Sequence, residues 1–422
     1  MTRPTPRGFT LTELLIAALA ASIVAVTAIS MLTSQQRLFQ RSNGERALQE
    51  TGRIALDEIT ANLRLAGFGI DPGVAFDFGA LASVAMDRAP AGAAVSAASL
   101  VCTSPVTCRD SVTGPDQIVF AYRNPGFVRA LAAAPSTSTL TLTGPLNAPL
   151  YRNQVLQVIC APESDAMRWA YVTVGQYVAP TTAATVSVTL ASGNGDQIPY
   201  QNGYLTDGCF SAVAPQGSTS STFEAAAKVY KVERFRYYVA TYDAAGTVVA
   251  NGTAGAKPYL MLDQGLLDAS GNAVLSVIAP DVEDLQFAYV FPNSPTTALQ
   301  VIGATPGTAI ASGASGIDLA PAVGSPAFGD AAGSARRATQ HPGNIRAVEV
   351  AVVARSPEPD TRILDAAIPP SMNRDPTSLA APAGHRRQLF QTTAAVRNTD
   401  ARAPYFPVYS TSAGDHYNVG GG

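Results

Sequence analysis

Charged side chains are scarce in this chain of 422 residues, of which only 14% are Asp, Glu, Lys or Arg. Lysine occurs three times, at Lys228, Lys231 and Lys257, and the formal net charge is −3. A chain without a basic excess or a Lys/Arg cluster lacks the electrostatic footprint of a nucleic-acid-binding protein. We therefore expect no nucleic-acid partner.

Histidine is also rare, and its three copies stand apart in loop-like surroundings, at His341, His385 and His416. No serine or cysteine lies in a nucleophile-elbow pattern of the Gly-x-Ser-x-Gly type. The five residues between Cys102 and Cys108 do not fit the usual spacing of a zinc-binding pair. The sequence therefore predicts a protein that is not an enzyme, with no catalytic residues, metal, cofactor or small-molecule substrate.

Cysteine occurs only four times, at Cys102, Cys108, Cys160 and Cys209, all beyond the N-terminal apolar run. An even number of cysteines in an exported domain favours disulfide bonds. Proximity in sequence favours a Cys102–Cys108 bridge, which leaves Cys160 and Cys209 as the second pair. Three pairings are formally open, and so is the alternative that one pair stays reduced and buried.

The longest apolar run lies near the N-terminus. Residues 9–33 span twenty-five positions and contain one ionisable side chain, Glu13. As a helix rising about 1.5 Å per residue, this run can cross a bilayer core of roughly 30 Å. Arg3 and Arg7 precede it directly and predict that the N-terminus faces the cytoplasm.

The stretch Gly8-Phe9-Thr10-Leu11-Thr12-Glu13-Leu14 resembles the signal of type IV prepilins. In that family a membrane peptidase cuts after the Gly, methylates the new amino terminus and leaves the apolar segment on the mature protein. The resemblance implies that residues 1–8 are a leader peptide, that prepilin peptidase cuts between Gly8 and Phe9, and that Phe9 is N-methylated.

Glu13 is expected to pair with a positive charge during assembly, because a carboxylate within an apolar helix is costly and normally has a partner. Phe9 lies one helical turn earlier, and its amine would become free and positive on cleavage. The amine of Phe9, in the same or a neighbouring subunit, is the expected partner. The alternative is that Glu13 lies in the interfacial layer, where the helix dipole favours an acid near the helix start.

Helical spacing continues beyond the apolar run. The apolar residues Leu48, Ala55, Ile59, Leu63 and Ala66 recur at helical intervals, and no proline occurs between residues 6 and 72. We expect one helix, with residues 9–33 as a membrane and assembly segment and residues 34–66 as an amphipathic continuation. Major pilins usually have a Pro in the membrane half, so its absence points to a minor pilin or a secretion pseudopilin.

Two glycines, Gly44 and Gly52, are expected weak points where this helix bends or frays. The sequence Gly67-Phe68-Gly69 predicts its end.

Residues 67–422 are predicted to form a β-rich exported domain, because the chain contains 35 Gly and 30 Pro among short strand-like runs. Residues 292–343 show no sustained pattern and are expected to be a flexible surface insertion. Residues 242–247 and 268–271 predict hairpin turns and not calcium loops. The expected strands are 117–123, 137–143, 155–160, 168–178, 185–190, 228–241, 259–263, 273–279, 283–291, 345–355 and 387–396. The predicted fold class is α+β and type IV pilin-like: a long helix packed on a large antiparallel β domain with long loops.

Four segments between residues 228 and 398 resemble successive blocks of the PilW family of minor pilins. These segments are 232–238, 282–289, 345–350 and 387–398. The resemblance implies a structural subunit that primes pilus assembly in a minor-pilin tip complex and supports adhesion and twitching motility. The implied partners are prepilin peptidase, other minor pilins, the major pilin and a large tip adhesin. The implied location is the bacterial inner membrane, with the bulk of the chain in the periplasm, and then the pilus fibre or tip.

Two alternatives remain open. One is a J-like minor pseudopilin of a type II secretion system, which shares the signal and the general layout. The other is a membrane-anchored periplasmic adhesive or binding module that never enters a filament.

Overall fold

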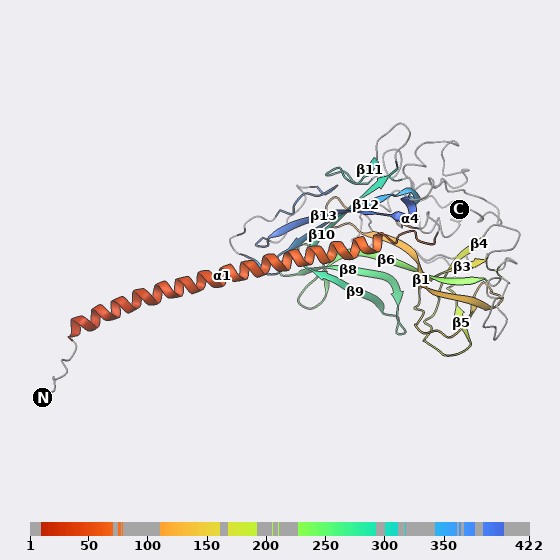
Figure 1. Ribbon diagram of the computed structural model, residues 1–422, viewed down its shortest axis with the longest axis horizontal. Helices are drawn as coiled ribbons and strands as arrows, with labels where there is room; N and C mark the ends of the chain where they lie inside the picture. The colour runs from red at the N-terminus through yellow and green to blue at the C-terminus, as the bar shows by residue number, and fades with distance from the viewer. Residues whose placement is uncertain are drawn as a thin grey trace, which may run out of the picture.

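A long N-terminal helix attached to a large antiparallel β domain makes up the computed structural model (Figure 1). The structure describes residues 10–70, 75–76, 78, 110–160, 168–191, 205, 210, 227–292, 300–310, 317, 342–360, 363, 367–375 and 383–400. The predicted α+β class, with a long apolar helix preceding an antiparallel β domain, is confirmed.

Helix α1 runs without interruption from Leu11 to Leu63, over 53 residues. At about 1.5 Å per residue, it is about 80 Å long. Its first 33 residues, 11–43, project away from the domain and are exposed along all sides (Figure 1). From Leu48 onward, buried residues recur every three or four positions, at Gly52, Ala55, Ile59 and Leu63. The predicted apolar stripe is therefore the face that packs on the domain.

The β domain contains thirteen strands within the described ranges. They are β1 (Ile118–Ala133), β2 (Thr139–Thr143), β3 (Val155–Cys160), β4 (Arg168–Thr173), β5 (Thr185–Thr189), β6 (Lys228–Tyr242), β7 (Val248–Val249), β8 (Lys257–Leu267), β9 (Ala273–Pro280), β10 (Val282–Phe291), β11 (Gln300–Ile302), β12 (Ala347–Arg355) and β13 (Arg387–Ala395). A 3-10 turn, η6 (Pro342–Asn344), precedes β12, and a short helix, α4 (Arg397–Asp400), follows β13.

The strands form a nine-stranded sheet and a four-stranded sheet, both antiparallel. The smaller sheet has the order β11-β10-β12-β13. In the larger sheet, β6 is central. One edge of β6 pairs with β1. On the other edge, residues 228–232 pair with β3 and residues 236–242 pair with β8. The early and late strand sets of the sequence therefore belong to one sheet.

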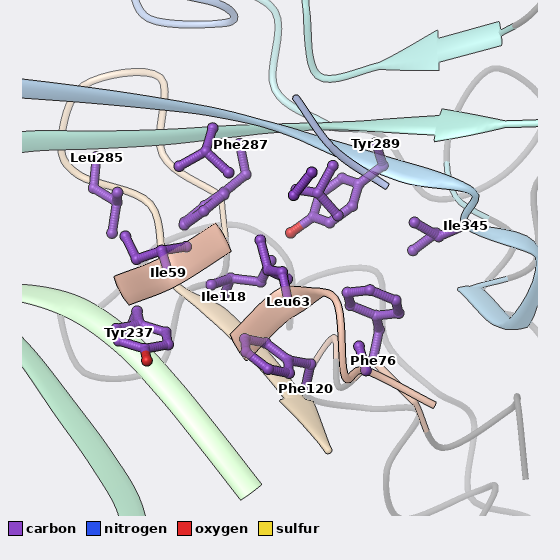
Figure 2. Close-up of a cluster of buried hydrophobic side chains, with 14 of the residues drawn as sticks. Ile59, Leu63, Phe76, Ile118, Phe120, Tyr237, Leu285, Phe287, Tyr289 and Ile345 are labelled. Carbon is purple, nitrogen blue, oxygen red and sulfur yellow. The ribbon is translucent and has the colours of Figure 1, made fainter. Parts of the chain in front are cut away.

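The main hydrophobic core lies between the two sheets, and α1 fills the space between them. Figure 2 shows Ile59 and Leu63 of α1 next to Leu285 and Phe287 of β10 on one side and Tyr237 of β6 on the other. Burying an Ile or Leu side chain stabilises a protein by about 1.5–3 kcal/mol. The second half of α1 is therefore part of the folded domain.

Several strands differ from their expected limits. Strand β3 matches its prediction, whereas β1 continues ten residues beyond the expected end at Arg123. The register of β1 against β6 shifts between Arg123 and Val128. A bulge of this kind accommodates the intervening Pro125 and Gly126, which as turn-forming residues predicted a strand end.

The expectation of a flexible surface insertion over residues 292–343 needs correction. Residues 300–302 form β11 on the edge of the four-stranded sheet, and Ile302, Ile310 and Ile317 are buried in the main core. These apolar residues enter the core singly, so they produce no periodic pattern in the sequence.

The two predicted hairpin turns are confirmed. Asp243 Oδ1 accepts hydrogen bonds from the backbone N–H groups of Ala245 and Thr247 at 2.9 and 2.8 Å. Asp268 Oδ1 does the same for Ser270 and Asn272 at 2.8 and 2.9 Å. These Asp side chains stabilise their own turns.

Gly52 is a packing site and not the weak point that its residue type predicted. The helix is continuous through it, and a Cβ at this position would lie 2.2 Å from Cε2 of Phe390 on β13. The absence of a side chain lets the Phe390 ring contact the helix. At Gly44, by contrast, an added Cβ would meet nothing within 4 Å.

The same substitution is therefore expected to have opposite effects at the two glycines. Gly44→Ala should raise the free energy of unfolding by about 0.5–1 kcal/mol, because alanine favours the helix. Gly52→Ala should lower it by about 1–3 kcal/mol, because the methyl group displaces the Phe390 ring. Urea unfolding of both full-length variants in detergent measures the two free energies. Effects of the same sign would contradict the contact between Gly52 and Phe390.

Candidate functional site

The start of α1 is fixed by a capping box. Thr10 is the N-cap residue, and the Glu13 backbone N–H donates to Thr10 Oγ1 at 3.3 Å. The Thr10 backbone N–H and hydroxyl donate to Glu13 Oε2 at 3.0 and 2.9 Å. The Thr-x-x-Glu pattern at residues 10–13 is the sequence signature of a capping box. The expectations for Glu13 did not include this role. Gly8 and Phe9 lie outside the described residues, so the expected pairing of Glu13 with the Phe9 amine stays a prediction.

The projecting part of α1 has the chemistry of a membrane span. The helix is long and apolar enough to cross a membrane, and none of its most apolar stretch is buried against the protein. The hydroxyls of Ser22, Thr27, Ser30 and Thr33 all donate to backbone carbonyls of the preceding turn, at 2.8–3.0 Å. A polar group that enters a lipid core needs such an internal partner. This geometry suits a single-pass anchor.

A short stalk of mostly polar residues, 34–43, separates the apolar run from the domain. Residues 34–43 are all exposed, and at about 1.5 Å per residue they hold the domain roughly 15 Å from the end of the apolar run. Leu38 and Phe39 in this stalk are exposed as well. Arg41 pairs with Glu45 one turn later, at 3.2 Å.

Strand β13 and helix α4 fasten the second half of α1 along its length. Arg386 Nη1 lies 2.5 Å from Glu45 Oε1 at the stalk end of the contact. At the far end, Asn398 Nδ2 donates to the carbonyl oxygens of Arg64, Leu65 and Ala66 at 3.4, 3.3 and 3.1 Å. These carbonyls belong to the turn that directly follows the helix, so the Asn398 side chain ties α4 to the end of α1. The packed half of α1 is thus attached to the domain at both of its ends.

Three buried carboxylates and one buried guanidinium form a cluster in which the pKa values of all three acids are raised. Asp110, Asp116, Asp284 and Arg374 are all at most 4% exposed. Arg374 Nη1 lies 3.6 Å from Asp284 Oδ1. Burial raises the pKa of Asp110 and of Asp284 to about 6, although Arg374 acts to lower the latter. Burial, and then the charge of Asp110, raises the pKa of Asp116 well above its usual range.

This carboxylate cluster fastens loops to the middle of β10. Asp116 accepts hydrogen bonds from the backbone N–H groups of Ser111 and Phe287 at 2.7 and 3.0 Å. Asp110 accepts from the Ile310 backbone N–H at 2.8 Å and from Asn373 Nδ2 at 2.5 Å. The cluster therefore holds together segments that are far apart in sequence. In the described part of the chain, no group of three His, Cys, Asp or Glu is arranged to hold a metal ion.

Protonation of the cluster should stabilise the folded state. Because Asp110 and Asp284 have a raised pKa when folded, their contribution is complete below the unfolded value of 3.8 and is lost as the pH rises through about 6. For Asp110 the change across this window is up to about 3 kcal/mol. Asp110→Asn should therefore flatten the dependence of the unfolding free energy on pH.

The readout for Asp110→Asn is the slope against pH and not the absolute stability, because the amide also loses a hydrogen bond. Burial lowers the pKa of His385. The titration of His385 therefore makes the folded state more stable as the pH rises, which is opposite to the effect of Asp110. His385 is present in both proteins, so its effect cancels in the comparison. Equal slopes for the two proteins would show that Asp110 does not titrate as described.

The expected disulfides are only partly covered by the described residues. Cys160 ends β3, is buried and is disulfide-bonded. Cys102, Cys108 and Cys209 lie outside the described residues, so the pairing of Cys102 with Cys108 and of Cys160 with Cys209 stays a prediction.

No protein-family model, curated protein or solved structure matches this chain. A function therefore has to be inferred from α1 itself: its exposed apolar part, its capped start and its attachment to the β domain.

Proposed function

We propose that this chain is a PilW-like minor pilin of a type IV pilus, a structural subunit without enzymatic activity. It is made as an inner-membrane precursor, cut by prepilin peptidase between Gly8 and Phe9, and methylated at Phe9. It then joins other minor pilins in a tip complex that primes growth of the major-pilin fibre. At the tip it supports adhesion, together with a large adhesin, and twitching motility.

The observation that carries this proposal is the continuity of α1. The exposed apolar half and the half packed into the domain core belong to one uninterrupted helix. A simple anchor needs only a flexible tether to its domain. A rigid connection has a further use, because it moves the domain with the apolar segment when the segment leaves the bilayer. In a fibre, the apolar segments of neighbouring subunits would then cover the α1 side chains that lipid covered before.

The size of the domain supports a place at the tip. Its two sheets, of nine and four strands, extend well to the sides of the helix (Figure 1). A subunit of this bulk is harder to repeat at close spacing along a thin fibre than to place once at its end.

Co-purification tests the proposal against its two alternatives. The full-length tagged chain is crosslinked in cells, extracted in detergent and captured, and its partners are identified. Other minor pilins and the major pilin are expected. Recovery of secretion pseudopilins would favour a type II secretion role, and recovery of neither would favour a membrane-anchored module. Deletion of the gene should abolish twitching and leave protein secretion intact.

A further inference from the structure

The charged side chains of α1 are distributed unevenly along the helix. Between residues 14 and 46 they are Arg37, Arg41, Arg46 and one acid, Glu45. Over residues 47–63 the balance reverses, because three acids accompany a single arginine. Basic side chains are therefore concentrated in and just beyond the stalk, where α1 leaves the apolar run.

The stalk lies at the depth of the lipid headgroups when the apolar run spans a bilayer. The helix continues from the apolar run into the stalk without a break, so the position of a residue along the axis sets its height. At about 1.5 Å per residue, Arg37 lies roughly 6 Å and Arg41 roughly 12 Å beyond residue 33. The headgroup layer on one side of a bilayer is roughly 5–8 Å thick. Arg37 therefore lies within this layer, and the long side chain of Arg41 can reach back to it.

The stalk presents apolar and basic side chains that the domain does not cover (Figure 1). Leu38 and Phe39 are 64% and 69% exposed. Arg37 and Arg41 are one turn apart on one side of the helix, and Phe39 points to the opposite side. A helix that stands in the headgroup layer meets lipid on both sides. Aromatic and arginine side chains are typical of the positions where a membrane span enters this layer.

The nearby acid does not cancel the positive charge of the stalk. Glu45 Oε1 lies 3.2 Å from Arg41 Nε and 2.5 Å from Arg386 Nη1 of the domain, so two arginines share one carboxylate. Arg37 has no acid one turn before or after it in the sequence, where Thr, Ser, Gln and Arg occur. The stalk therefore keeps a positive surplus. Guanidinium groups suit phosphate, because two of their N–H groups can donate to two of its oxygens.

We propose that the stalk binds anionic phospholipids in the bilayer leaflet next to the β domain. Arg37 and Arg41 donate to the lipid phosphates, and Leu38 and Phe39 insert between the lipids around them. Anionic lipids are favoured over zwitterionic ones, because a zwitterionic headgroup carries its own cation, which competes with the arginines for the phosphate. The inference rests on the membrane span of the proposed function and applies to the chain before it enters a filament.

Tryptophan probes on α1 measure the depth of the stalk. The full-length protein is reconstituted in vesicles of phosphatidylcholine and phosphatidylglycerol, and the single native tryptophan, Trp169 on β4, supplies a constant background. Val24→Trp in the apolar run should be quenched by a nitroxide on the lipid acyl chains. Phe39→Trp should be quenched by a nitroxide on the headgroups. Gln49→Trp is exposed and about 15 Å beyond Phe39, so it is the control that neither label should quench strongly.

Energy transfer from Phe39→Trp to acyl-labelled lipids measures the lipid preference. At low salt, labelled phosphatidylglycerol should be enriched about threefold or more over labelled phosphatidylcholine near the probe. Arg37→Gln combined with Arg41→Gln should abolish this enrichment. Arg53→Gln is the matched control, because Arg53 is an exposed arginine about 18 Å further along α1, and it should leave the enrichment unchanged. These substitutions change exposed side chains, so the domain should fold in every variant.

Equal transfer to the two lipids would overturn the proposal, and so would an enrichment that survives the double substitution. Quenching of Val24→Trp without quenching of Phe39→Trp would overturn this inference and leave the membrane anchor intact. Absence of quenching at Val24→Trp would overturn the anchor and this inference together.

Discussion

Replacing Glu13 by Gln should reduce incorporation of this chain into pili at least tenfold, while leaving its helix intact. The amide can keep the capping contacts with Thr10, since the capping box accepts Glu or Gln at this position. What the substitution removes is the negative charge. If that charge pairs with the amine of Phe9, in the same or a neighbouring subunit, assembly fails and the precursor is still processed. Immunoblots of sheared pili and of membranes measure the two steps separately.

Thr10→Ala is the matched control for Glu13→Gln. It removes the hydroxyl that caps the helix and leaves the charge of Glu13 in place. Loss of an N-cap typically costs about 1 kcal/mol, and a span held by lipid can absorb this cost. We expect near-normal incorporation of Thr10→Ala. The opposite pattern, in which Thr10→Ala fails and Glu13→Gln assembles, would assign Glu13 to capping alone.

Arg374→Met should lower the free energy of unfolding by about 3–5 kcal/mol, which is the usual range when one partner of a buried ion pair is removed. Arg374 is fully buried, and its Nη1 lies 3.6 Å from Oδ1 of Asp284, which is also buried. Without it, the Asp284 carboxylate stays buried and loses the positive charge that acts to lower its pKa. The same change at the exposed Arg53 should cost less than about 0.5 kcal/mol.

A double-mutant cycle shows whether the loss comes from the unpaired carboxylate. Arg374→Met combined with Asp284→Asn removes both charges, so it should be more stable than the Arg374→Met single variant. The expected coupling energy is about 1–3 kcal/mol, measured by urea unfolding near neutral pH. Additive losses would show that Arg374 acts through packing and not through charge.

Helix α1 and the positions of most strands could be predicted from the sequence because their patterns are long and regular. The helical spacing of apolar residues from Leu48 to Leu63 identified the buried face of α1. The alternation of valines identified β12. Strands that contain bulges were predicted too short. Gly265 at the bulged end of β8 has a φ of +72°, and a glycine in that position predicts a turn as readily as a bulge.

Contacts between distant residues could not be predicted from one sequence. The exchange of partners along β6 depends on where β3 and β8 end relative to each other. The carboxylate cluster joins Asp110 to Asn373 across 263 positions, and nothing near either residue announces that it is buried. The residue type of Gly52 predicted a helix weak point, which is wrong, because its packing role depends on the contact with Phe390 of β13.

The mass and N-terminal sequence of the mature chain test the central claim most directly. The protein is purified from membranes of the native host and its first peptide is sequenced by mass spectrometry. The prediction is a chain that begins with N-methylated Phe9 and retains the whole apolar segment. A mature chain that begins at Met1, or beyond the apolar segment, would contradict the proposal that this is a processed pilin subunit.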